Sequence, residues 1–416
     1  MNSKNIEIPD YVQAIVDKTC LKLYTMNYNE LEAELPIKPG CNWLGEILKI
    51  TAKIDQNNKD LFPNLSLIAK ILPSSKLYRN LFSARIVFDR EVYMYEKVLP
   101  EFIKIQQENN IDEIFAPFVK CFETSSDENR EVILLENMNV RGYRMINYHK
   151  TVDYDHAALA MKTLGKFHAL SFALREQKPE MFKEFGNNTR ESYFSSSFRN
   201  LFVKVTQNLS FQILKQLQKG SEVFRKFENF IMNPNFVIDE IMKPELAEDY
   251  SVIGHGDFQT KNLMWKYESN LKPNFPTDIC LLDWQLSRIG SPCLDVSMFL
   301  WFCTDKDLRK FHYKKLLEIY YSNFSSFLKD LGGSSEISFP VTVFKEHLKK
   351  FSVIGLYLGI WVILGNMTDS QDTPDITDCD GIESAIHVYS STVCNDSYFT
   401  TMKNLIEDFV ECGYNL

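Results

Sequence analysis

VIGHGDFQTKNLMW, residues 252–265, is the most informative stretch of the 416-residue chain. A short apolar run leads into the tripeptide HGD, which ends at Asp257, and Asn262 follows the aspartate by five positions. A second apolar run, within LLDWQ at 281–285, also ends in a carboxylate, Asp283. Chance in a long globular chain is one explanation of this spacing. The other is a site that handles phosphate.

Phosphoryl transfer to a hydroxyl group needs few protein parts: a base, ligands for Mg²⁺ and a cation on the phosphates. The catalytic loop of kinases reads H-x-D with an asparagine five positions after the aspartate, and His255, Asp257 and Asn262 have this spacing. Asp283 stands where a second metal ligand belongs. Because it lies 21 positions after Asn262, there is room for two short strands and a turn between them.

A lysine and a glutamate further upstream supply the remaining parts. Lys70 lies in the apolar run 65–72, which predicts a strand, and Glu91 lies in 83–103, whose apolar spacing predicts the next helix. An unpaired lysine among apolar residues would be unfavourable, so we predict a Lys70–Glu91 ion pair. Two alternatives stay open. Lys70 could be a solvated lysine on an edge strand, and Glu96 could face the cleft in place of Glu91.

GCNWLGE, residues 40–46, lies where a loop covering the phosphates is expected. Gly40 and Gly45 have the spacing of a Walker A motif, but Glu46 and Ile47 replace its lysine and its serine or threonine. The P-loop interpretation therefore fails. A glycine-containing turn over phosphates and an ordinary hairpin turn both remain open.

Length and composition indicate a globular chain with more than one lobe. A chain of 416 residues exceeds one ordinary core, and 45% apolar residues exclude disorder. The net charge of −9 argues against nucleic acid or an anionic membrane as the main partner. The nine cysteines form no C-x-x-C pair and the N-terminal residues show no signal-peptide core, so free thiols and a cytoplasmic location are expected.

The order of the local signals predicts an α+β protein with two lobes. A small β-rich N-terminal lobe is expected over 1–137, with a hairpin of the strands 46–54 and 65–72. A larger, mainly helical C-terminal lobe is expected over 138–416. The charge-free stretch 351–368 is at the lower edge of the length of a membrane span. We favour a buried helix there and expect no stable membrane insertion.

Three further features have ordinary structural interpretations. Asp295 begins an apolar helix, where capping and the helix dipole account for a carboxylate. His168 lies among apolar residues of an amphipathic helix and is interpreted as a core histidine with satisfied hydrogen bonds, although histidine also serves acid–base chemistry. The acidic stretch 372–381 lacks the ligand spacing of a calcium loop and is interpreted as a surface loop. The seven histidines show no zinc-ligand spacing.

The motifs HGDFQTKN, LLDWQLSRIGSPCLDVSMFL, LGKFHALSFAL and LLENM together resemble the ecdysteroid kinase-like family. This family belongs with choline kinases and aminoglycoside phosphotransferases in the protein-kinase-like fold. The resemblance implies that Asp257 is the catalytic base. It also implies Asn262 and Asp283 as Mg²⁺ ligands, and Lys70 with Glu91 as the pair that positions the phosphates.

The same resemblance implies an ATP site between the lobes. Glu136 to Met138 would form the hinge, where backbone groups meet adenine, and Asn42 would contribute from the glycine-containing loop. Asn137 stands in this hinge where the family usually has an aspartate. Asp295 would brace the catalytic loop through hydrogen bonds.

These features lead to one main hypothesis and two alternatives. The main hypothesis is an ATP- and Mg²⁺-dependent kinase that phosphorylates a hydroxyl of a small acceptor, such as an ecdysteroid or another hydroxylated lipophile. A catalytically silent ligand-binding or scaffold protein on the same fold is the alternative, because fold alone does not settle function. The second alternative is a membrane-anchored protein that uses residues 351–368 as its anchor.

Overall fold

The computed structural model describes most of the chain. The described residues are 6–24, 28, 30–35, 45–53, 64–73, 75–147, 149–194, 196–268, 275–368, 384, 388, 395–414 and 416. Asn42 and the acidic stretch 372–381 lie outside them.

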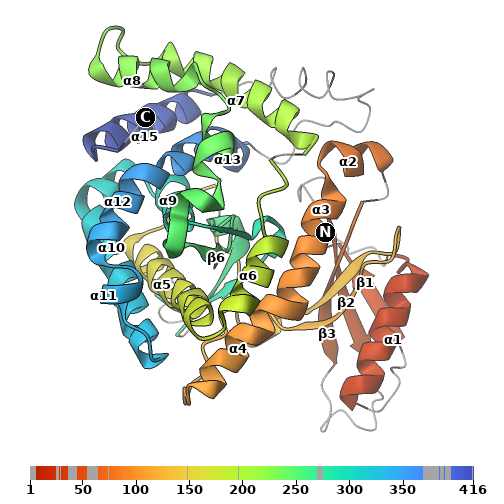
Figure 1. Ribbon diagram of the computed structural model, residues 1–416. Helices are drawn as coiled ribbons and strands as arrows, with labels where there is room; N and C mark the ends of the chain where they lie inside the picture. The colour runs from red at the N-terminus through yellow and green to blue at the C-terminus, as the bar shows by residue number, and fades with distance from the viewer. Residues whose placement is uncertain are drawn as a thin grey trace.

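A five-stranded antiparallel sheet, ordered β1-β2-β3-β5-β4, forms the N-terminal part of the chain together with several helices (Figure 1). The strands are β1 Glu30–Glu34, β2 Glu46–Lys53, β3 Leu65–Ile71, β4 Cys121–Ser125 and β5 Val132–Glu136. The helices are α1 Asp10–Tyr24, α2 Lys76–Leu81, α3 Ala84–Tyr93, the π-helical turn η2 Met94–Val98 and α4 Leu99–Glu108. The predicted hairpin is confirmed as β2 and β3, and the predicted helix over 83–103 is α3, η2 and the first half of α4.

The two faces of this sheet have different neighbours. Side chains alternate between the faces of a strand, and along β3 this alternation buries Leu67 and Ala69 in a core shared with α1. Lys70 therefore points to the opposite face, which is the side of α3. The register pairs Lys70 with Ile47 of β2 and Ile133 of β5. Lys70 thus lies on an interior strand, and the alternative of a solvated edge-strand lysine is wrong.

The rest of the chain is mainly helical (Figure 1). The long helices α5 and α10 pack along each other, and α13 packs on α9. The α-helices are α5 Tyr154–Gln177, α6 Pro179–Asn188, α7 Phe198–Leu214, α8 Glu222–Ile231, α9 Cys293–Phe302, α10 Lys306–Asp330, α11 Ser335–Ser338, α12 Val341–Phe351, α13 Val353–Met367 and α15 Asp396–Glu411. The shorter turns are η3 Met138–Arg141, η4 Val237–Ile241, η5 Pro244–Tyr250, η6 Thr260–Asn262 and η7 Trp284–Leu286.

Two small antiparallel ribbons lie among these helices and carry the motif residues. One pairs β6 Val252–Gly254 with β9 Arg288–Gly290, and the other pairs β7 Leu263–Tyr267 with β8 Pro276–Leu281. β7 and β8 are the two strands predicted between Asn262 and Asp283. A small antiparallel sheet beside a larger helical part confirms the predicted α+β fold class. The lobe boundary at residues 137 and 138 stays a prediction.

The charge-free stretch near the C-terminal end forms a buried helix, as predicted. Most side chains of α13 are buried, among them Ile354, Leu356 and Ile360. In the part of the chain that the structure describes, no single helix has the length and hydropathy to cross a membrane. Helices α12 and α13 reach that length only as a pair, with a bend of 46° between them.

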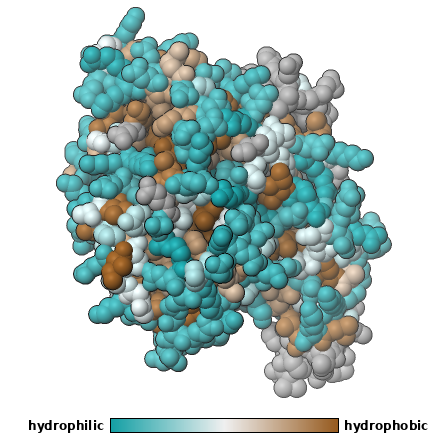
Figure 2. Space-filling view, in the orientation of Figure 1, coloured by the Kyte–Doolittle hydropathy of each residue, from teal (hydrophilic) through white to brown (hydrophobic). Residues whose placement is uncertain are grey.

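The face of the molecule in Figure 2 is mostly hydrophilic. Its hydrophobic residues form small, separated groups. Large exposed apolar side chains, such as Phe311 and Ile337, occur at scattered positions of the chain. Isolated exposed apolar residues are normal on globular proteins, so this face offers no continuous apolar docking surface.

Candidate functional site

The loop between β6 and β7 places Asp257 through a tight turn. Gly256 has φ of +80°, a backbone conformation that L side chains rarely adopt. A Cβ atom at this position would lie 1.7 Å from the carbonyl oxygen of Leu286. The turn therefore requires glycine for two independent reasons, and it orients the carboxylate of the next residue.

The carboxylate of Asp295 accepts hydrogen bonds from the backbone of this loop. Its Oδ2 accepts a hydrogen bond from His255 N at 2.7 Å, and its Oδ1 accepts one from Gly256 N at 2.8 Å. His168 Nε2 lies 3.1 Å from the same Oδ2, and its Nδ1 lies 2.8 Å from the hydroxyl of Tyr320. Because a carboxylate only accepts, Nε2 carries a proton and donates it to Asp295.

The bracing role of Asp295 replaces the capping interpretation. Helix α9 begins at Cys293 with Pro292 as its N-cap, and the Asp295 carboxylate turns to the catalytic loop rather than to its own helix. Burial acts to raise the pKa of Asp295, but His168 and the loop amides outweigh it and lower the pKa. Asp295 is therefore an ionised buried acceptor. His168 is the satisfied core histidine that the sequence predicted.

Both carboxylate oxygens of Asp257 are held by side-chain amides. Gln259 Nε2 donates to Oδ1 at 2.7 Å, and Asn262 Nδ2 donates to Oδ2 at 2.8 Å. Burial and the nearby Asp283 carboxylate raise the pKa of Asp257 to about 6, although the two amides lower it. A carboxylate with a pKa close to neutral is suited to accept a proton and to release it again. Sequence reasoning did not identify Gln259, although it lies two positions after Asp257.

His255 has a structural role in this loop. Its ring is fully buried, and Nε2 lies 3.0 Å from the carbonyl oxygen of Leu282. A carbonyl only accepts, so Nε2 carries a proton. Burial lowers the pKa of His255, which favours the neutral ring. The ring therefore joins the catalytic loop to the segment that carries Asp283.

Lys70 joins the sheet to two carboxylates. Its Nζ lies 2.6 Å from Glu91 Oε2 on α3 and 2.9 Å from Asp283 Oδ1. The predicted Lys70–Glu91 pair is present. The alternative of Glu96 is wrong, because Glu96 is exposed and accepts a hydrogen bond from Thr124 Oγ1 of β4.

The charge state of Lys70 follows from this arrangement. Burial acts to lower its pKa, but Asp283 and Glu91 together outweigh burial and raise it. Lys70 is therefore a buried ammonium between two acidic side chains. Asp283 has φ of +65°, which is uncommon for a residue other than glycine. Strained backbone of this kind concentrates at functional sites.

The two candidate metal ligands lie side by side. Leu282 N donates to Asn262 O at 2.9 Å, and Leu263 pairs with Leu281 between β7 and β8. Asp283 thus follows directly after the residue that bonds to Asn262.

The donor chemistry of this pair fits Mg²⁺. Asn262 uses its Nδ2 on Asp257, which leaves Oδ1 as a hard oxygen donor, and Asp283 uses one oxygen on Lys70. Within the described residues, no group of three or more His, Cys, Asp or Glu could form a metal cage. Mg²⁺ commonly binds through one or two protein oxygens together with substrate phosphates. Asn262 and Asp283 are the residues that would hold it.

The predicted hinge follows β5 directly. Glu136 pairs with Leu67 of β3, and Met138 is the first residue of the turn η3. The first N–H groups of a helix lack acceptors within the helix, so the Met138 amide has no acceptor within η3. Asn137, where the family usually has an aspartate, donates from Nδ2 to Ser66 Oγ at 2.9 Å.

The glycine-containing loop is described only at its end. Asn42 lies outside the described residues, so its predicted contact with nucleotide stays a prediction. A Cβ atom at Gly45 would lie 3.1 Å from the carbonyl oxygen of Ile71 and 3.5 Å from Cγ of Lys70. The loop therefore rejoins the sheet directly against Lys70.

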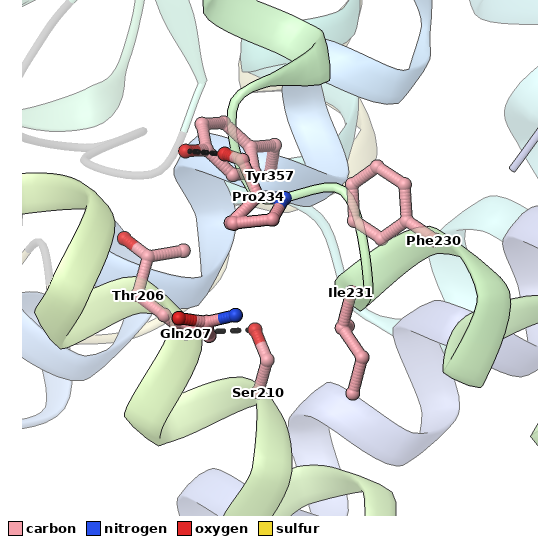
Figure 3. Close-up of a pocket in the computed structure, with 7 residues that line it drawn as sticks. All are labelled: Thr206, Gln207, Ser210, Phe230, Ile231, Pro234 and Tyr357. Atoms are coloured by element: carbon pink, nitrogen blue, oxygen red, sulfur yellow. Dashed lines mark hydrogen bonds between the residues drawn. The ribbon is translucent and has the colours of Figure 1, made fainter.

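A small pocket lies elsewhere, between α7, α8 and α13 (Figure 3). Its lining includes Thr206, Ser210, Ile231 and Tyr357, and its cavity volume is about 10 Å³, roughly what one water molecule needs. Small-molecule sites usually measure roughly 300 to 1,000 Å³. None of the candidate catalytic residues lines this pocket, so we assign it no part in the site.

The arrangement of the sheet, the Lys70–Glu91 pair, the braced catalytic loop and Asp283 defines a protein-kinase-like fold. The chain belongs to the ecdysteroid kinase-like family, whose sequence profile matches residues 39–333, more than half of the chain. Among curated proteins, no match was found.

Solved structures resemble the chain only loosely. They include the GDP and kanamycin complex of APH(2″)-IIIa, with 10% identity, a TM-score of 0.40 and coverage of 90% of this chain and 97% of that chain. The GDP complex of wild-type aminoglycoside 2′-phosphotransferase-IIIa has 10% identity, a TM-score of 0.39 and coverage of 92% and 98%. A glucosamine kinase has 8% identity, a TM-score of 0.30 and coverage of 95% and 97%. Superpositions this loose place no individual residue.

Proposed function

We propose that this protein is an ATP- and Mg²⁺-dependent kinase that transfers the γ-phosphate to a hydroxyl group of a small acceptor. The observation that carries the proposal is the buried Lys70 held by Glu91 and Asp283. An ammonium placed in this way is suited to bind nucleotide phosphates. Membership of the ecdysteroid kinase-like family supports the same reaction class.

In this mechanism every side chain of the site has a role. Asp257 accepts the proton of the acceptor hydroxyl as its oxygen attacks the γ-phosphorus in line, and ADP leaves with the electrons of the broken bond. Gln259 and Asn262 keep the carboxylate oriented during the attack. Lys70 binds the phosphate oxygens. Mg²⁺, held by Asn262 and Asp283, would neutralise the charge that develops on the phosphates.

The nucleotide base would lie at the hinge. The backbone amide of Met138, at the start of η3, would donate to an adenine ring nitrogen, and the backbone of Glu136, at the end of β5, would contribute a second contact. The acceptor proposal rests on the family alone, and it specifies an ecdysteroid or another hydroxylated lipophile. A hydroxyl group on such a molecule would have to reach Asp257.

Calorimetric titration with ATP, with and without Mg²⁺, tests the proposal. The wild type should bind ATP more tightly with Mg²⁺, and Asp283→Ala should remove most of this dependence because one metal ligand is lost. Asp278→Ala is the matched control, because Asp278 lies on β8 and bonds to Tyr143 rather than to the site. ATP binding that changes neither with Mg²⁺ nor in Asp283→Ala would favour the catalytically silent alternative.

A further inference from the structure

A cluster of buried charged residues joins helix α3 to the helical part of the chain. Arg90, directly before Glu91, is 6% exposed. Its Nη2 donates to the carbonyl oxygen of Arg190 at 2.5 Å and to Ser192 Oγ. Both acceptors lie in the described part of 189–197, the connector between α6 and α7. The helix that carries Glu91 is therefore attached to a segment outside the N-terminal sheet.

On its other side the connector meets the catalytic loop. Arg288 is 2% exposed, and its Nη1 lies 3.2 Å from Glu191 Oε2. Its Nη2 donates to the carbonyl oxygen of Gly256 at 2.6 Å. A chain of polar contacts thus leads from Arg90, through the connector, to the residue directly before Asp257.

The connector region also contacts both ends of α3. Ser197 Oγ lies 3.1 Å from Ser83 Oγ, at the start of the helix. Asn188, the last residue of α6, donates from Nδ2 to the hydroxyl of Tyr93 at 3.2 Å, at the end of the helix. Figure 1 shows α6 beside α3, on the side away from the sheet. The contact through Arg90 is therefore the middle one of three.

The burial of Arg90 is not explained by stability. Burial lowers its pKa, Glu191 raises it and Arg288 lowers it again, so two cations share one carboxylate. Arg90 Nε and Nη1 have no hydrogen-bond acceptor within the described residues. An incompletely paired buried charge is unfavourable for folding. A methionine of similar length should therefore leave the fold intact.

We propose that Arg90 is a positioning residue: through the connector, whose Glu191 pairs with Arg288, it fixes α3 relative to the catalytic loop and keeps Glu91 on Lys70 before nucleotide binds. This inference rests on the proposed function, because the Lys70–Glu91 pair has a catalytic purpose only if Lys70 binds phosphate. It adds a link between α3 and the loop of Asp257 that does not involve nucleotide.

Two measurements on the full-length protein test this proposal. The first is the affinity for ATP with Mg²⁺ by calorimetry, and the second is amide hydrogen exchange of α3 in the ligand-free protein. The variants are Arg90→Met, the conservative Arg90→Lys and Glu191→Gln. Arg85→Met is the matched control, because Arg85 lies on the same helix but bonds to Asp89 and Glu131 within the N-terminal part.

Arg90→Met should weaken Mg²⁺-dependent ATP binding by about tenfold, the size of a coupling within one hydrogen-bonded network. It should also accelerate exchange along α3 while the thermal midpoint stays near that of the wild type. In both measurements Arg90→Lys should lie between the wild type and Arg90→Met, and Arg85→Met should match the wild type. Should Arg90→Met fail to fold, Glu191→Gln takes its place, with the same expected losses.

The proposal would be overturned if Arg90→Met bound ATP with the affinity of the wild type and showed the same hydrogen exchange along α3. Equal losses in Arg90→Met and Arg85→Met would also overturn it, because they would show a general effect on α3. Failure of the wild type to bind ATP would contradict the proposed function instead. The exchange comparison of ligand-free variants would then still decide whether Arg90 fixes α3.

Discussion

Replacing Asp295 by asparagine should destabilise the protein by an amount that its contacts define. Three donors point at the two carboxylate oxygens: Gly256 N at Oδ1, and His255 N and His168 Nε2 at Oδ2. The asparagine amide has only one oxygen, so its best orientation keeps the two donors of Oδ2 and loses Gly256 N. A buried hydrogen bond to a charged acceptor is lost and an N–H is left unpaired.

We expect the free energy of unfolding to fall by about 2 to 4 kcal/mol in Asp295→Asn. Urea unfolding followed by tryptophan fluorescence measures this change, because the Trp284 ring lies 4.6 Å from the His255 ring and reports on the loop. The slope of the transition should stay that of the wild type. Without the hydrogen bond from Gly256 N to Asp295, the loop would no longer hold Asp257 in position. The rate of phosphoryl transfer should therefore fall together with stability.

Asp305→Asn provides the matched control for this variant. Asp305 is the N-cap of α10 and accepts a hydrogen bond from Leu308 N at 2.8 Å. Asparagine caps helices as well as aspartate does, so stability should change by less than about 0.5 kcal/mol. A loss in Asp295→Asn no larger than that of the control would refute the bracing role of this carboxylate.

Three further predictions concern the base. The rate of transfer should decline as the pH falls through about 6, because protonated Asp257 cannot accept the hydroxyl proton; a profile of kcat/KM against pH checks this. Gln259→Leu should move this decline to higher pH, since the hydrogen bond from Gln259 lowers the pKa of Asp257. An unmoved decline would show that Gln259 does not act on the base. Asp257→Asn should retain calorimetric ATP binding, and loss of that binding would contradict a role confined to the acceptor.

Local patterns in the sequence were sufficient to predict the main parts of the site. The apolar run 65–72 placed Lys70 on a strand, and the apolar spacing of 83–103 placed Glu91 on the next helix. The ion pair between them follows from these two facts and the unfavourable burial of a lone lysine. The two strands between Asn262 and Asp283 followed from the length of that segment.

Contacts between distant segments were not predictable in the same way. The hydrogen bonds of Asp295 and Arg288 go to Gly256, 39 and 32 positions earlier in the chain, and no local pattern encodes such pairs. Capping was the best local account of Asp295, and tertiary structure overrode it. Arg288 was not singled out from the sequence, because its burial on β9 is visible only in the structure.

Strand β1 was missed for a different reason. Its sequence, Glu30–Glu34, contains three glutamates, which are uncommon in strands. The strand is paired by register to β2, where Lys49 and Lys53 form ion pairs with Glu34 and Glu30. Cross-strand pairs of opposite charge stabilise a strand of low intrinsic propensity, and they become visible only when the partner strand is known.

Transfer of the γ-phosphate tests the central claim most directly. The protein would be incubated with Mg²⁺ and γ-labelled ATP, together with a panel of hydroxylated steroids and other hydroxylated lipophiles. The account predicts labelled phosphate covalently attached to at least one acceptor by the wild type, and none by Asp257→Asn. Label transferred equally by both proteins would contradict the assignment of the base. A wild type that binds ATP with Mg²⁺ but labels no acceptor in the panel would contradict the proposed acceptor class.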